Sequence, residues 1–186
     1  GSPTWKTCSD NLCTENPFTG TCNAVDDADP KLGVICYIEW DCASSTTTSI
    51  FTRSTDCTIT GSNHVAVTNT LEINGTNTDM NNLITITAAS KHRHFYLNNA
   101  NAKLILRYLK LVGGDVSSYS SQNCEHCGGS ILIYTNGGEL NLYSSIVFNN
   151  KVKYGGGIAS AHGDSSTNRN AIMNIYNSII HNNEAA

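Results

Sequence analysis

Basic side chains and two histidines form the most suggestive chemical cluster in the sequence. One residue separates His92 from His94, and no acid interrupts the basic positions between Asp79 and Asp115. On a β-strand, alternate residues share a face, so this run could hold a metal ion, bind an anionic glycan or partner, or supply the base of a lyase. It is also typical of a charged surface that keeps a strand soluble. The candidate binding residues are Lys91, His92, Arg93, His94, Lys103, Arg107 and Lys110.

Carboxylate pairs, which glycoside hydrolysis requires, are sparse. Asn77-Thr78-Asp79 resembles a motif of pectin-type glycoside hydrolases, but the Asp26-Asp27 pair lies upstream of it rather than downstream. An inverting hydrolase holds its two carboxyl groups about 6.5–9.5 Å apart. We therefore predict no catalytic residues, no cofactor and no metal site. The alternative is a carbohydrate-active β-helical lyase, epimerase or hydrolase that acts on an acidic glycan.

The eight cysteines are unevenly distributed and indicate disulfides outside the cytosol. Six in about sixty residues is the density of small secreted modules, and they permit fifteen pairings. A second group is a CxxC in a loop, which we interpret as a loop-closing disulfide because the helix of a redox motif is missing. Asn74-Gly75-Thr76 adds a glycosylation sequon. The predicted disulfide cysteines are Cys8, Cys13, Cys22, Cys36, Cys42, Cys57, Cys124 and Cys127.

The amino-acid composition and the net charge argue against several classes of protein. Charged residues make up 14% of the chain, well below the roughly 25% usual for soluble domains. A net charge of −4 argues against a nucleic-acid partner. No apolar run approaches the roughly 18 residues of a membrane span. Polarity comes instead from Asn, Thr and Ser, which disfavour helix interiors, so a helical bundle is excluded.

Repeats in the second half of the chain predict a solenoid. Gly128-Gly129-Ser130-Ile131 recurs as Gly155-Gly156-Gly157-Ile158 after 27 residues, and the segment 142–150 recurs at 175–183 after 33 residues. A fainter copy lies 36 residues before the first, at 106–114. Three short strands with turns make a coil of this length, and a repeat of this length is typical of a parallel β-helix. Stacked coils place like residues on like residues, so aliphatic stacks and an Asn ladder at 149–150 and 182–183 are expected.

The paired motifs GGx[IL] and xxxN resemble the repeats of polymorphic outer-membrane-protein-like, right-handed parallel β-helix proteins. The resemblance covers roughly residues 100 to 186, with Val147 and Ile180 at positions that carry Phe in that family. It implies an all-β, right-handed parallel β-helix, surface display and adhesion. Because β-helices also carry enzymes, the fold alone does not decide the function.

These observations predict two regions: an irregular, disulfide-rich cap over residues 1–60 and β-helix coils over 61–186 that end within a repeat. An uncapped coil exposes a row of backbone donors and acceptors. We expect either a fragment of a longer repeat protein or a head-to-tail filament subunit. The predicted function is an extracellular or cell-surface structural or adhesive protein. It would bind a protein or glycan partner, or assemble, through its surface or open coil end.

Overall fold

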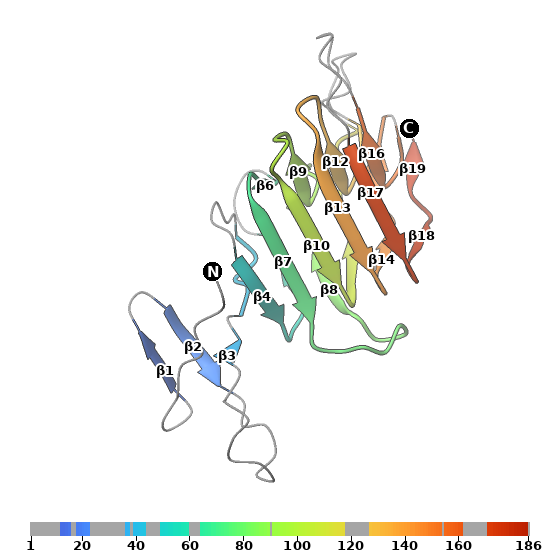
Figure 1. Ribbon diagram of the computed structural model, residues 1–186. Coiled ribbons are helices and arrows are strands. Elements are labelled where there is room, and N and C mark those ends of the chain that lie inside the picture. Colours follow the sequence, from blue (N-terminus) through green and yellow to red (C-terminus); the bar gives the residue numbers. More distant parts are fainter. Residues whose placement is uncertain are drawn as a thin grey trace.

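Parallel strands stacked into a β-solenoid dominate the fold (Figure 1). The computed structural model describes residues 12–15, 18–22, 36–37, 39–43, 49–59, 64–89, 91–117, 127–153, 155–161 and 171–185. Within these residues there is no helix, and so none that could cross a membrane. The predicted all-β parallel β-helix is confirmed.

Three parallel sheets form the sides of the solenoid. The first sheet contains β4 (Ser49–Arg53), β7 (Thr70–Gly75), β10 (Lys103–Arg107), β13 (Gly138–Tyr143) and β17 (Ala171–Tyr176). The second contains β5 (Cys57–Thr58), β8 (Ile84–Thr87), β11 (Leu109–Val112), β14 (Ile146–Phe148) and β18 (Ile179–His181). The third contains β6 (Val65–Val67), β9 (Phe95–Leu97), β12 (Ile131–Ile133) and β16 (Ile158–Ser160). One strand from each sheet makes a coil.

Two smaller sheets complete the described strands. The first is antiparallel and contains β1 (Leu12–Glu15), β2 (Phe18–Cys22) and β3 (Cys36–Tyr37). In the other, β15 (Lys151–Val152) pairs in parallel with β19 (Glu184–Ala185), so the last coil consists of β17, β18 and β19.

The strand register follows the sequence repeats residue by residue. Leu142 pairs with Ile175 across 33 residues, and Leu106 pairs with Leu142 across 36. Ile131 pairs with Ile158, as the glycine-pair repeat predicts. The first coil begins at Ser49 rather than after residue 60, because β4 and β5 pair in parallel with β7 and β8.

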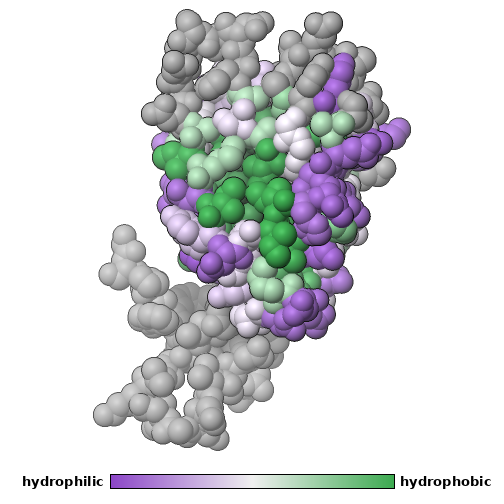
Figure 2. Space-filling model, turned by 90° about the vertical axis from the view of Figure 1, so that its right-hand side faces the viewer, coloured by the Kyte–Doolittle hydropathy of each residue, from purple (hydrophilic) through white to green (hydrophobic). Residues whose placement is uncertain are grey.

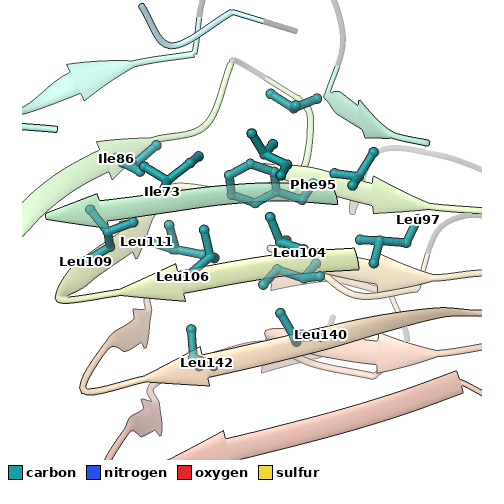
Figure 3. Close-up of a cluster of buried hydrophobic side chains, with 14 of the residues drawn as sticks. Ile73, Ile86, Phe95, Leu97, Leu104, Leu106, Leu109, Leu111, Leu140 and Leu142 are labelled. Carbon is teal, nitrogen blue, oxygen red and sulfur yellow. The ribbon is translucent and has the colours of Figure 1, made fainter. Parts of the chain in front are cut away.

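The core consists of aliphatic columns that run along the solenoid (Figure 3). One column passes through Leu71, Leu104 and Leu140, each almost completely buried. Alternate residues of each strand point inward, so equivalent positions of successive coils stack about 4.8 Å apart. Two further columns are Ile73–Leu106–Leu142 in the first sheet and Ile86–Leu111–Val147 in the second.

Residues in the left-handed conformation make the corners between the sheets. Ser144 and Asn177 occupy the corner between the first and second sheets with φ near 44° and 48°. Asn149 and Asn182 follow the second sheet with φ of 52° and 50°. Asn tolerates this conformation better than other side chains, which is why Asn recurs at the spacing of the coils.

A plug centred on Trp40 closes the solenoid at the amino-terminal side. Trp40 is 1% exposed, and its ring stacks on Phe95 with centroids 6.0 Å apart. Its backbone N–H donates to the carbonyl of Thr52 at 2.8 Å, so it occupies part of the outer edge of β4. A disulfide joins Cys42 in the same segment to Cys57 in β5.

Candidate functional site

The first four predicted basic residues lie at the corner between β8 and β9, and they differ in how deeply their side chains are buried. Lys91 is exposed and His92 is half-buried, but Arg93 and His94 are buried. The guanidinium of Arg93 lies 5.6 Å from the ring centroid of Tyr96 on the third sheet. The four residues therefore do not present one basic surface.

The other three predicted basic residues lie on two different sheets, beside partners from neighbouring coils. On β10, Lys103 Nζ lies 3.0 Å from Glu139 Oε1, and Arg107 Nε lies 3.2 Å from Glu72 Oε1. Lys110 is on β11 in the second sheet, 5.2 Å from the ring centroid of Phe148. Acids from adjacent coils pair with Lys103 and Arg107, and Lys110 lies on another sheet, so the seven residues do not form one continuous basic surface. Binding of a ligand by these residues stays a prediction.

His94 is a structural side chain inside the solenoid. Its Nε2 lies 3.0 Å from the carbonyl of Ile86, so Nε2 carries the proton and donates it. Nδ1 then accepts from the hydroxyl of Ser130 at 3.0 Å. Burial lowers the pKa of His94 to about 4, against the opposing effect of the Ile86 and Val112 carbonyls. Both ring nitrogens of the neutral His94 side chain therefore form hydrogen bonds, which stabilise the interior of the solenoid.

The carboxylates of the first sheet lack the features of a glycosidase pair. The hydrogen bond from Asn141 and the ion pair with Lys103 lower the pKa of Glu139, whereas a general acid needs a raised pKa. Asp79, in the motif shared with hydrolases, accepts hydrogen bonds from the backbone and side chain of Asn81 at 3.0 and 3.2 Å. This hydrogen-bond pattern is an Asx turn. Among the described residues, no group of three or more His, Cys, Asp or Glu could hold a metal ion.

The predicted disulfide residues are only partly within the described part of the chain. Cys42 pairs with Cys57, and Cys127 is also disulfide-bonded. Cys8 and Cys124 lie outside the described residues, as do the side chains of Cys13, Cys22 and Cys36.

The predicted glycosylation site, Asn74, lies near the end of β7. Its side chain is half-buried between Thr52 and Arg107 of the adjacent strands, and its Oδ1 is buried without a hydrogen-bond partner. Glycosylation at Asn74 stays a prediction.

The open face of the last coil is the most distinctive surface of the molecule. Met173, Ile175 and Ile180 continue the three buried columns, in register with Leu140, Leu142 and Val147. They are 36%, 41% and 43% exposed, whereas Leu140, Leu142 and Val147 are buried. Figure 2 shows this end as an apolar area bordered by hydrophilic side chains. Large contiguous apolar patches are uncommon on the surfaces of monomeric proteins.

Three outward-facing residues widen the same apolar area. Ile172 and Tyr176 lie on β17 and Ile179 on β18, all close to half exposed. The ring of Tyr176 stacks on Tyr143 with centroids 5.1 Å apart and planes 9° apart. We call these six residues, three inward and three outward, the open face. Sequence reasoning predicted an open end but did not name its residues, although the 33-residue repeat already aligned them with buried positions.

Comparison with protein-family models, with curated proteins and with solved structures gave no match. The resemblance to the polymorphic outer-membrane-protein-like repeats stays a prediction that rests on the repeat motifs of the sequence.

Proposed function

We propose that this protein is an extracellular structural or adhesive solenoid that binds another polypeptide through the open face. The observation that carries the proposal is the exposure of Met173, Ile175 and Ile180, whose equivalents in the preceding coil are all buried. Complete burial of an exposed large aliphatic side chain contributes about 1.5–3 kcal/mol. Because these three are 36–43% exposed, covering each of them contributes only part of that amount. The disulfide between Cys42 and Cys57 fits an extracellular setting.

Backbone groups add a second reason for association. β17, β18 and β19 are the outermost strands of their sheets and carry unpaired donors and acceptors along one edge. An edge of this kind is a template for strand addition, in which main-chain hydrogen bonds supply affinity and side-chain pockets supply specificity. On the outer face of the first sheet, by contrast, Glu72 and Glu139 pair with Arg107 and Lys103.

The test compares the native size of wild type with that of Ile175→Lys combined with Ile180→Lys. Native complexes isolated from the cells that produce the protein are expected to be larger than a single copy of it. In the double variant the fraction in complexes should fall at least about tenfold, since each unpaired charge costs more than 1.4 kcal/mol at the interface.

Ile50→Lys is the matched control, because Ile50 is a 64% exposed apolar residue at the opposite end. It should leave the complexes intact, and circular dichroism should report a folded protein in all cases. Complexes that survive the double variant unchanged, or a wild type that is exclusively monomeric in this material, would contradict the proposal.

A further inference from the structure

Three imidazoles and one guanidinium gather at the corner between β8 and β9. We call this group the histidine corner: His64, His92, Arg93 and His94. His64 belongs to the first coil, directly before β6, and the other three precede β9 in the second coil. The His64 ring packs against Tyr96 with centroids 4.9 Å apart, and the Arg93 guanidinium lies 5.6 Å from the same ring. Charged and titratable side chains from two coils therefore share one aromatic neighbour.

The backbone of this corner joins three successive coils. The N–H of Val65, in the first coil, donates to the carbonyl of His94 at 2.8 Å. The N–H of His94 donates in turn to the carbonyl of Ser130, in the third coil, at 2.8 Å. From the same coil, the N–H of Asp115 donates to the carbonyl of His92 at 3.0 Å. A displacement of the corner would therefore break hydrogen bonds to the coils on both sides.

Uncharged groups surround the ring of His94. It meets the carbonyls of Ile86 and Val112 and the hydroxyl of Ser130. The residue is 0% exposed, and burial lowers its pKa to about 4, against the opposing effect of the two carbonyls. A second ring proton would place a positive charge among groups that are not ionic, which is costly in the interior of a protein.

Positive charge, together with burial, acts on His64. Burial, followed by the charges of Arg93 and His92, lowers the pKa of His64 to about 4. Asp115 is bonded to the corner through its backbone, but its carboxylate accepts hydrogen bonds from the N–H and the hydroxyl of Ser117 at 2.9 and 2.6 Å. Protonation of His64 therefore adds a charge of the same sign beside Arg93.

The first two coils are joined differently on the other sheets. β4 and β7 have five and six residues, whereas β6 and β9 have three each. On the second sheet, Asp56 Oδ1 accepts from the N–H of Thr85 at 2.7 Å, and the N–H of Ile59 donates to the carbonyl of Thr87 at 2.9 Å. These contacts involve no imidazole, the group that gains a proton in mild acid. Mild acid therefore acts on the third sheet.

We infer that the histidine corner is an acid-operated latch, which opens the third sheet between β6 and β9 while the other two sheets stay paired. Opening brings the rings of His64 and His94 into water, where each can bind a proton without penalty. Because their pKa values are about 4 in the fold and 6.5 in water, closure is fully stabilised above pH 6.5 and weakens as the pH falls toward 4. This latch does not depend on the open face or its partner.

Hydrogen exchange of two buried amides in the unmodified chain tests the latch. The Val65 amide joins the first two coils on the third sheet, and the Ile59 amide joins the same coils beside the second sheet. Protection factors, which correct for the direct effect of pH on exchange, are compared at about pH 7.5 and about pH 5.5. Each imidazole favours the open state about tenfold at the lower pH. We expect protection of Val65 to fall about 100-fold and that of Ile59 by less than about threefold.

Single variants assign the effect to the two imidazoles. His64→Gln and His94→Gln each remove one titrating ring, so each should leave only about a tenfold fall at Val65. His64 is half-buried, so its variant stays informative where the variant of the buried His94 folds poorly. Lys91→Gln is the matched control, because it removes an exposed positive charge at the same corner and no imidazole. It should leave the 100-fold fall unchanged.

Three outcomes would overturn the latch. Equal losses of protection at Val65 and Ile59 would show that acid unfolds the coils as a whole. Unchanged protection at Val65 would show that the corner takes up no protons on opening. A fall at Val65 that persists in full in His64→Gln would show that other groups drive the opening.

Discussion

The two ends of the solenoid present the same repeating strands to different surroundings. At the amino-terminal end, Trp40 covers the interior and is 1% exposed. At the carboxy-terminal end, Met173, Ile175 and Ile180 occupy inward positions and are 36–43% exposed. The same columns of inward side chains run through the whole solenoid. The two ends therefore differ in exposure because of what covers the outermost strands, and not because of the strands themselves.

This contrast shows that closure of a β-helix is a local property. At the corners beside β11 and β14, backbone N–H groups donate to Ser and Asn side chains of the following coil. The amino-terminal end replaces a missing neighbour with one large aromatic ring, one disulfide and an ion pair between Arg53 and Glu39. Solenoids require such capping elements, and the open face lacks one within the described residues.

The largest expected effect comes from removing the plug. Trp40→Ala deletes a fully buried aromatic side chain and should lower the free energy of unfolding by about 3–5 kcal/mol. Ile175→Ala, at the equivalent depth of the open end, should cost less than about 2 kcal/mol, because its side chain is already partly solvated. Urea unfolding of both variants measures the difference. Equal losses would show that the two ends are closed to the same degree.

Breaking the disulfide of the plug is expected to be nearly as costly. Cys42→Ser combined with Cys57→Ser opens a loop of 15 residues, for which chain entropy predicts a loss of about 3 kcal/mol. Thermal unfolding without reductant measures this loss and leaves the other disulfides formed. If the double variant were as stable as the wild type, Trp40 would keep the plug in place without the disulfide.

Acid should destabilise the interior through His94. Because its pKa is about 4 in the fold and about 6.5 in the unfolded chain, the unfolded state binds more protons between these values. Its stabilising contribution is complete above pH 6.5 and is lost as the pH falls toward 4, by up to about 3 kcal/mol. Burial and the charges of Arg93 and His92 also lower the pKa of His64 to about 4. His64 therefore adds a second loss of stability in the same pH range.

Urea titrations from pH 4 to pH 7 measure this dependence. His94→Gln keeps a donor and an acceptor but does not titrate, so it should flatten the curve in part. Ile50→Gln, at an exposed position of β4 without an ionisable group, is the control and should leave the curve unchanged. An unaltered pH dependence in the His94 variant would contradict the buried neutral imidazole.

The smallest predicted difference compares two rungs of the Asn ladder. Asn150→Ala leaves the buried N–H of Gly114 without its acceptor and should cost about 1–3 kcal/mol. Asn183→Ala removes the same contacts one coil later, where water replaces them, and should cost about 1 kcal/mol. Denaturant midpoints of the two variants check the order. A larger loss for Asn183 would indicate that the last coil is covered.

The sequence repeats predicted the register of the coils because stacked strands repeat their inward positions. The 33- and 36-residue spacings place Leu106, Leu142 and Ile175 in one column, and the structure pairs them so. The repeats found in the sequence begin at residue 106 and do not reach β7. Its outward Glu72 and Asn74 interrupt the apolar run, and only the alternation with Leu71 and Ile73 identifies it.

The ion pairs of the basic residues and the plug around Trp40 could not be predicted from the sequence, because both depend on contacts between coils. The basic run looked unopposed along the chain, yet Glu72 and Glu139 reach Arg107 and Lys103 from the coils on either side. A linear reading does not register lateral neighbours about 35 residues away. Trp40 is likewise a single residue outside any repeat, so no periodicity indicates that it seals the interior.

The asymmetry of the ends is tested most directly by hydrogen exchange of two amides in the isolated chain. The N–H of Trp40 donates to Thr52 at the closed end, and the N–H of Ile179 donates to Ser145 at the open end. We predict that the Trp40 amide exchanges about 100-fold more slowly, equivalent to about 2.7 kcal/mol of additional protection. Equal rates, or slower exchange at Ile179, would contradict a solenoid that is closed at one end and open at the other.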